Sequence, residues 1–161
     1  MVTIYYLEML DSSDLRGKRA SKGLQVRECE IPQSQVNRFL YRTVGEAWDW
    51  TERLSWSDEQ WRALVASTDH RTWIASCKGA IAGYYELRRA RDTGVEILYF
   101  GLAPRFIGQG LGGYLLTHAI ESAWAWEGAE RVWVHTCSLD HPGALRNYQA
   151  RGFRLYKEEP G

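Results

Sequence analysis

The stretch FIGQGLGG, residues 106–113, places glycines at positions 108, 110 and 113 in the order G-x-G-x-x-G. This spacing is the fingerprint of a dinucleotide-binding turn, in which the backbone approaches a pyrophosphate at a helix N-terminus. It also suits other phosphate-binding loops, and three glycines can simply let a strand turn tightly into a helix. The loop alone leaves these three interpretations open, so its surroundings must decide among them.

Hydrophobic periodicity and turn residues predict alternating strands and helices around this loop. Ser34 and Ser57 are expected to cap the first two helices, with Gln60 completing a capping box, and Pro142 to lie in the first turn of the last helix. Residues 11–23 form a polar loop. The expected strands are 2–10, 24–31, 72–79, 80–90, 95–103, 131–137 and 153–158, and the expected helices 35–47, 58–67, 112–126 and 141–151.

This order of elements argues against a dinucleotide-binding fold. That fold needs two mononucleotide-binding halves and many parallel strands, and residues 114–161 are too few to supply them. The strand after the loop ends in Thr136 and Cys137, where the fingerprint requires an acidic residue. A phosphate at the helix N-terminus survives as an interpretation, in one mixed α/β domain over residues 1–161.

Composition narrows the class of protein further. Lys+Arg and Asp+Glu both number 20, so the net charge is zero and no basic excess points to nucleic acid or an anionic membrane. The hydrophobic content of 45% is that of a folded chain. Three widely spaced cysteines and the absence of a long apolar run predict a cytoplasmic protein with no membrane partner.

Two motifs, Arg105-x-x-Gly108-x-Gly110 and the stretch at residues 141–153, resemble the GNAT superfamily of acyl-CoA-dependent N-acetyltransferases. Arg105-x-x-Gly108-x-Gly110 resembles that superfamily's R/Q-x-x-G-x-G/A loop, whose amides hold the pyrophosphate of coenzyme A. HPGALRNYQARGF, residues 141–153, resembles a later helix with the pattern N-x-x-A-x-x-x-Y-x-x-x-G-F, although His141 stands where Asn is usual. The resemblance covers residues 72–158, the cofactor half. The residues that match the second pattern are Ala144, Tyr148, Gly152 and Phe153.

The resemblance implies an α/β fold of the α+β type, with a GNAT-like mixed, mostly antiparallel sheet flanked by helices and an additional N-terminal strand. Members usually have two strands after the second motif, and this sequence has room for one. We therefore expect the strand at 2–10 to fill the missing place, either in its own chain or in a neighbour's. A homodimer is plausible by analogy.

The resemblance also implies acetyl-CoA as co-substrate. The backbone N–H of Leu102 is expected to polarise the thioester carbonyl, where strand 95–103 splays from strand 131–137 with a bulge favoured by Gly101. Arg105 either contacts the phosphates or is a solvated loop residue. The expected coenzyme-binding residues are Leu102, Arg105, Gly108, Gln109, Gly110, Leu111, Gly112, Gly113, His141 and Ala144.

Acetylation of an amine needs a base for the ammonium proton and an acid for the leaving thiolate. Glu96 is the expected base, by resemblance to a glutamate that some members place on this strand; alternatively it is a solvated carboxylate or a partner of Arg88 or Arg91. Tyr148 is the expected acid, and otherwise a packing tyrosine. No cysteine lies beside an obvious base, so direct attack in a ternary complex is predicted.

The stretch GEAWDWTERLSW, residues 45–56, is expected to border the acceptor site. Trp48, Trp50 and Trp56 could wall it, and acidic residues among them could attract a cation; the alternative is that these indoles are core plugs with satisfied N–H groups. The prediction is a small-molecule amine acceptor, with Trp48, Trp50 and Glu96 binding it. The acidic residues are Glu46, Asp49 and Glu52.

Other functions stay open at this point. The acceptor could be a protein N-terminus or lysine, or the chain could be a non-catalytic acyl-CoA-binding sensor. A metal site is the weaker interpretation, since HTCSLDH offers zinc-ligand types without a zinc-binding spacing, and no metal is predicted. The residues concerned are His135, Cys137, Asp140 and His141.

Overall fold

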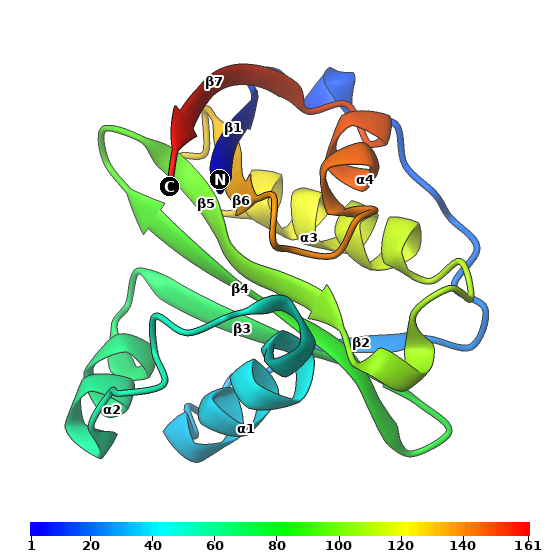
Figure 1. Cartoon of the computed structure of the whole chain (residues 1–161). Helices are drawn as coiled ribbons and strands as arrows, with labels where there is room; N and C mark the ends of the chain where they lie inside the picture. Colours follow the sequence, from blue (N-terminus) through cyan, green and yellow to red (C-terminus); the bar gives the residue numbers. More distant parts are fainter.

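The computed structural model describes residues 1–161 and shows one twisted seven-stranded sheet with helices on both faces (Figure 1). Three short 3₁₀ turns, at Ser12–Asp14, Glu46–Trp48 and Pro104–Phe106, join the longer elements. The strands are β1 (Thr3–Met9), β2 (Gln25–Glu28), β3 (His70–Cys77), β4 (Ala80–Ala90), β5 (Gly94–Leu102), β6 (Val132–Cys137) and β7 (Arg154–Pro160). The helices are α1 (Ser34–Gly45), α2 (Asp58–Ala66), α3 (Gly112–Ala125) and α4 (Ala144–Ala150).

The strand order is β2-β3-β4-β5-β6-β1-β7, and only β5 and β6 run parallel. The predicted mixed, mostly antiparallel sheet is therefore confirmed. The N-terminal strand β1 lies between β6 and β7, antiparallel to both, with Tyr6 opposite His135 on one side and Lys157 on the other. The expectation that this strand fills a place in the sheet is confirmed, within the same chain.

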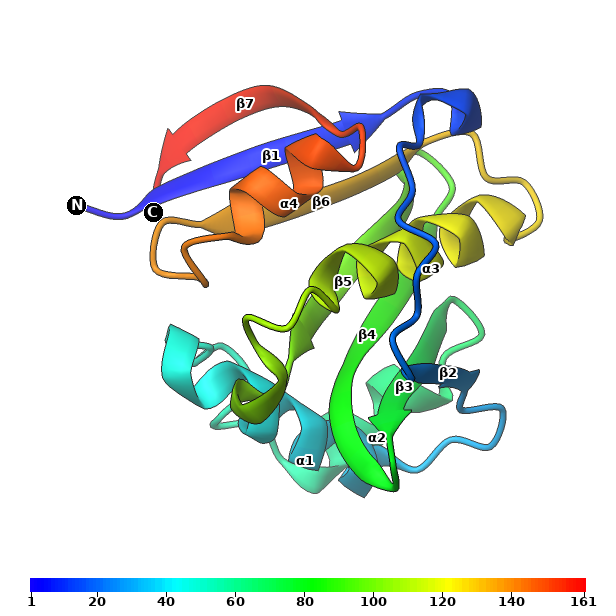
Figure 2. The same cartoon turned by 90° about the vertical axis from the view of Figure 1, so that its right-hand side faces the viewer.

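Alternation along the strands divides the sheet into two chemically different faces. One face is apolar and packs against α3, which lies with α4 on that side (Figure 2). Successive residues of β4 mark the division, since Tyr85 joins this main core while Tyr84 packs with Leu40 and Val44 of α1 on the other face. The other face of β5, β6 and β1 carries polar side chains, Glu96, His135 and Tyr6 among them.

The ends of the helices test the sequence predictions locally. The capping box at α2 is confirmed, with reciprocal hydrogen bonds between Ser57 and Gln60. The prediction that Ser34 caps α1 is wrong, because the helix begins at Ser34 and Gln33 occupies the cap position without a side-chain bond. Pro142 lies before α4 and not in its first turn. The Asp140 carboxylate and the ring of His141 instead accept backbone N–H bonds and hold that turn.

The predicted splay between β5 and β6 occurs, but its bulge does not lie at Gly101. β5 pairs with β6 only from Val95 to Ile97, and the two strands then diverge (Figure 2). The register with β4 shifts between Tyr99 and Ile97, so Leu98 is the bulged residue. Gly101 stays in register, and a Cβ there would lie 2.5 Å from Val44, so this glycine lets α1 approach β5 closely.

Gly152 fixes the turn between α4 and β7, and we expect Gly152→Ala to lower the free energy of unfolding by about 2–4 kcal/mol. Its φ is +109°, and a Cβ would overlap the backbone oxygen of Asp14, which cannot swing away as a side chain can. Urea denaturation of both variants measures the effect, with Gly128→Ala as the matched control. Gly128 has φ +83° and open space around its Cβ, so equal losses in the two variants would contradict the predicted clash.

Candidate active site

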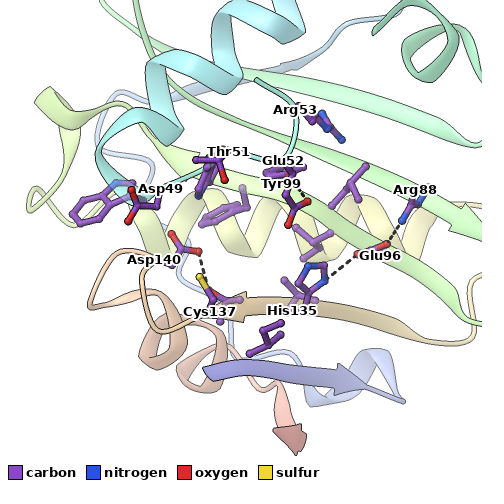
Figure 3. Close-up of a pocket in the computed structure, with 18 of the residues that line it drawn as sticks. Asp49, Thr51, Glu52, Arg53, Arg88, Glu96, Tyr99, His135, Cys137 and Asp140 are labelled. Carbon is purple, nitrogen blue, oxygen red and sulfur yellow. Dashed lines mark hydrogen bonds and ion pairs between the residues drawn. The ribbon is translucent and has the colours of Figure 1, made fainter. Parts of the chain in front are cut away.

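Two cavities adjoin along the diverging strands. The larger, of about 450 Å³, lies on the polar face of the sheet beneath the connection between α1 and α2 (Figure 3). The smaller cavity, of about 220 Å³, lies between α4 and the glycine loop, which is the stretch of residues 106–113. Their shared lining makes them two ends of one cleft, as two substrates reacting with each other require. The residues that line both are Trp48, Trp50, Phe100, Asp140 and Tyr148.

The smaller cavity collects most of the residues predicted to bind coenzyme. Arg105 and Gln109 are the exceptions, since neither lines it and the Gln109 side chain donates to the Arg105 carbonyl at 2.9 Å. Both face solvent. The predicted residues that do line the cavity are Leu102, Gly108, Gly110, Leu111, Gly112, Gly113, His141 and Ala144.

The glycine loop leads directly into α3, and no side chain caps the N-terminus of that helix. Gly108 and Gly110 adopt φ of +83° and +77°, a conformation that glycine takes without steric cost. Leu111 occupies the cap position, and no side chain bonds to the first-turn N–H groups. Those groups and the positive end of the helix dipole therefore face the cavity unpaired, which favours an anion there.

Three basic side chains lie beside this helix end without lining the smaller cavity itself, and the sequence predicted none of the three. Lys22 places Nζ 2.5 Å from where a Cβ of Gly110 would be, and Lys18 and Arg151 crowd Gly113 in the same way. Arg151 is only 8% exposed, its Nε and Nη1 have no hydrogen-bond partner, and burial lowers its pKa. Arg151 is thus a buried cation without an anionic partner, next to a helix end that has no side-chain cap.

The lysines come from the polar segment at 11–23, for which the sequence predicted only a loop. In the structure this segment crosses α3 (Figure 2), and the Lys18 N–H donates to the Thr117 hydroxyl at 2.9 Å. A further hydrogen bond, which the sequence did not predict, joins the two helices of the cavity, from the Asn147 side-chain amide to the Gly112 carbonyl at 3.2 Å. Long-range placement of this kind leaves no local signal in one sequence.

The backbone of β5 presents an N–H group to the space between the strands. The N–H of Ala103 donates to Ala82 of β4 at 2.8 Å. Successive N–H groups along a strand point to opposite sides, so that of Leu102 points away from β4, toward the gap left by β6. This is the orientation that polarising an acyl carbonyl in the cleft requires.

Tyr148 stands where the cavities meet. Its ring is 4% exposed and packs against Phe100 and Phe153, and its hydroxyl makes no hydrogen bond within the chain. Burial, and then the charge of Asp140, raise the pKa of Tyr148 well above that of a free phenol. The group therefore keeps its proton at neutral pH, and its unpartnered hydroxyl is available as a hydrogen-bond donor in the cleft.

Glu96 lies on the floor of the larger cavity and is not a free carboxylate. It is 3% exposed, its Oε1 pairs with the Arg88 guanidinium at 2.8 Å, and its Oε2 lies 3.3 Å from Nδ1 of His135 (Figure 3). The anticipated ion pair with Arg88 is therefore present. The hydrogen bond from His135 to Glu96 raises the pKa of His135. The sequence alone suggests only a metal-ligand role for His135.

The tryptophan-rich connection, residues 45–56 between α1 and α2, forms the far wall of the larger cavity. Its side chains Trp48, Trp50 and Trp56 line that cavity. Asp49 and Glu52 line it too, and Glu46 does not. Trp50 is partly buried and, besides lining the cavity, packs on the rings of Tyr41, Tyr84 and Tyr99. The neighbouring Trp61, which is outside this predicted set, is buried without a partner for its indole N–H.

A buried ion pair fixes this connection to the sheet. Arg53 donates from Nη1 to Glu86 of β4 at 2.9 Å, and its guanidinium lies 4.3 Å from the centre of the Tyr99 ring. Glu86 is fully buried and is also within 3.0 Å of His70 Nε2 and 3.1 Å of the Asn37 amide. Burial alone would raise the pKa of Glu86, but the His70 hydrogen bond and the Arg53 charge lower it to about 2.

No group of three or more histidine, cysteine, aspartate or glutamate side chains comes together in a way that could hold a metal ion. His135 is turned to Glu96, and Asp140 accepts from the Thr136 hydroxyl at 2.8 Å. No helix has the length and apolar character needed to cross a membrane.

Comparison with known proteins places this geometry in a family. The profile of the Acetyltransferase (GNAT) family matches residues 36–153. A search of curated proteins found no match. A GCN5-related N-acetyltransferase from Sphaerobacter thermophilus superposes with a TM-score of 0.71 at 18% identity, over 98% of this chain and 49% of its own.

Two further solved structures are of similar size to this chain. An IAA acetyltransferase from Bacillus cereus has a TM-score of 0.60 at 25% identity, covering 83% of this chain and 79% of its own. An aminoglycoside acetyltransferase from an uncultured soil metagenomic sample has a TM-score of 0.63 at 18% identity, covering 83% and 90%. Several other similar structures are longer, and this chain spans between about half and three fifths of their length.

Proposed function

The chain belongs to the GNAT family of acetyltransferases, and from that premise we propose that it transfers an acetyl group from acetyl-CoA to a small primary amine. The observation that carries the proposal is the single cleft whose two ends meet at Tyr148, one lined by the glycine loop and the other by acidic and aromatic side chains. The proposal includes one acyl-CoA N-acyltransferase domain over residues 1–161. We further propose that this domain acts in the cytoplasm and that it assembles as a homodimer.

The coenzyme occupies the smaller cavity in this proposal. Its pyrophosphate lies on the N–H groups from Gly108 to Gly113, and Lys18, Lys22 and Arg151 neutralise the phosphate charge. The pantetheine arm runs between the diverging ends of β5 and β6. The thioester carbonyl then meets the Leu102 N–H, and the sulfur lies by the Tyr148 hydroxyl.

The amine enters the larger cavity and attacks the acetyl carbon directly in a ternary complex. The buried centre formed by Glu96 and its partners supplies the proton acceptor that the ammonium group needs. As the C–N bond forms and the C–S bond breaks, Tyr148 gives its proton to the thiolate and regains one from the acylated nitrogen. Oxyanion stabilisation by Leu102 and proton transfer by Tyr148 act on the same intermediate.

The acceptor class follows from the lining of the larger cavity. Asp49 and Glu52 offer negative charge beside three indole faces, and both features attract a cation. Arg53 adds no free positive charge, since Glu86 neutralises it. A small cationic amine fits this lining, and the similar structure named as an aminoglycoside acetyltransferase supports the same class of acceptor.

Thiol release from acetyl-CoA, measured with polyamines, aminoglycosides, aromatic amines, amino acids and short peptides, tests the proposal. We expect release with at least one small cationic amine and an acetylated amine as the product. Acetyl-CoA binding without release on any amine would favour a sensor instead, and release on peptides alone a protein acceptor. Failure to bind acetyl-CoA would refute the assignment of the smaller cavity.

Lys22→Ala is expected to weaken acetyl-CoA binding about tenfold, because one charge-assisted contact to phosphate contributes roughly 1.5 kcal/mol. The loss should shrink as salt is added, since screening already weakens that contact in the wild type. Isothermal titration at two ionic strengths measures it. Arg91→Ala removes an exposed cation from the β4–β5 turn, away from both cavities, and an equal loss there would contradict a specific role for Lys22.

A further inference from the structure

We propose that His135, and not Glu96, is the group that takes the proton from the acceptor amine, with Glu96 as the positioning residue that orients the imidazole. This inference rests on the proposed function and assigns the proton transfer within it. It comes from the contacts of the two side chains, since Glu96 is buried and already committed on both oxygens while His135 has a free ring edge.

The geometry of Glu96 leaves little capacity for an incoming ammonium group. One oxygen is held by Arg88 at 2.8 Å and the other faces Nδ1 of His135 at 3.3 Å. Both carboxylate oxygens are therefore already engaged by neighbouring side chains, which leaves neither one open to an ammonium group in the cavity. The Glu96 side chain is 4% exposed, whereas that of His135 is 38% exposed.

His135 lies at the right place in the cleft. It lines the larger cavity directly beyond the last β5–β6 pair, Ile97 with Val134, where the strands begin to diverge. With Nδ1 turned to Glu96, Nε2 is the nitrogen left for a substrate proton. The arrangement is that of a base oriented by a carboxylate, in which the carboxylate fixes the tautomer and stabilises the imidazolium that forms.

The surrounding charges suit a base that works near neutral pH. Glu96 on β5 and the more distant Glu52 raise the pKa of His135, while burial and Arg88 on β4 oppose them, and the net shift is upward. On β1, Tyr6 faces the imidazole with ring centres 5.7 Å apart, and its hydroxyl donates to Glu159 of β7. A raised pKa makes this imidazole a stronger proton acceptor than a free histidine side chain.

The proton balance closes without another reactant. Nε2 of neutral His135 takes one proton from the ammonium group and leaves a free amine whose lone pair attacks the acetyl carbon. The C–S bond breaks, the thiolate takes the Tyr148 proton, and the second nitrogen proton of the product restores Tyr148. The imidazolium then releases its proton to water through its exposed edge, which gives one amide, one thiol and one proton for each turnover.

The pH profiles of two variants test the assignment, after wild-type turnover on an amine has been established. His135→Gln is expected to lower kcat by about 10²–10⁴-fold, to keep acetyl-CoA binding and to lose the acidic limb of the kcat/KM profile. Glu96→Gln is expected to keep that limb and move it to lower pH, because the carboxylate that raises the pKa of His135 is gone. His118→Gln, on α3 and outside both cavities, is the matched control and should leave kcat within about twofold.

Proton NMR gives a readout that does not depend on turnover. The chain has 4 histidines, and the resonance lost in His135→Gln identifies the imidazole concerned. The pH at the midpoint of the titration of this resonance should be lower in Glu96→Gln than in the wild type. Wild-type kcat and an intact acidic limb in His135→Gln would overturn the inference and leave the proposed function standing. Loss of the limb in Glu96→Gln alone would assign the proton to Glu96, and an inactive wild type would instead overturn the proposed function.

Discussion

Tyr148→Phe is expected to lower kcat by about 10²–10⁴-fold and to leave acetyl-CoA binding nearly unchanged. The variant removes only the hydroxyl, which makes no hydrogen bond within the chain, so the ring can keep its packing on Phe100 and Phe153. What is lost is the proton that the leaving thiolate would take, and general acid catalysis of this kind contributes about that factor. Steady-state turnover and titration of acetyl-CoA measure the two quantities separately.

The substrate itself supplies the control for this prediction. An acyl-CoA analogue with a more acidic thiol as leaving group needs the proton less, so Tyr148→Phe should slow its reaction by a smaller factor than it slows acetyl-CoA. Equal slowing of the two substrates would argue for a packing role. Tyr156→Phe removes an exposed phenol from β7 and should have no effect on turnover.

Arg53→Met is expected to lower the free energy of unfolding by about 3–5 kcal/mol, which is the usual cost of leaving a buried charge without its partner. Glu86 is fully buried and would keep only the neutral donor Asn37 and the ring of His70. Adding Glu86→Gln should recover part of the loss, because a neutral amide costs less to bury than a carboxylate. Urea denaturation of both variants measures the difference, and no recovery in the double variant would contradict the account.

The same network gives the pH dependence of stability its sign. The pKa of Glu86 is about 2 in the folded chain and that of an unfolded glutamate lies higher, near 4.5. The stabilisation by this carboxylate is therefore complete above about pH 4.5 and is lost as the pH falls toward 2. In Arg53→Met, the free energy of unfolding should fall less steeply than in the wild type as the pH drops over that range.

Because Arg53 anchors the tryptophan-rich connection, the Arg53→Met variant should also raise KM for the amine more than KM for acetyl-CoA.

The cofactor half of the fold could be predicted from the sequence because its signals are local. The glycine loop, the helix after it and the turn at Gly152 each depend on residues close together in the chain, and all three lie where expected. The place of β1 could be expected but not assigned to one chain, since its partners lie more than a hundred residues away. The bulge was misplaced because packing of α1, and not β5 itself, requires Gly101.

The residues of the candidate site could likewise be predicted from the sequence only where their signals are local. Tyr148 and most loop residues meet in the cleft as the motifs implied, whereas Lys22 and Arg151 reach the loop from distant segments that no spacing connects. The role expected of Glu96 differs once its neighbours are known. A strand pattern shows which face of the sheet Glu96 occupies, but it does not show that His135 lies 3.3 Å away on the next strand. Pairing between strands is decided by the whole fold, so one sequence leaves it open.

A crystal structure with a bisubstrate analogue, in which an accepted amine is joined to coenzyme A through an acetyl bridge, tests the central claim most directly. The account predicts the pyrophosphate on the N–H groups of residues 108–113, the sulfur within hydrogen-bond reach of the Tyr148 hydroxyl, and the amine nitrogen in the larger cavity facing His135. A coenzyme bound outside the smaller cavity, or a sulfur turned away from Tyr148, would contradict it.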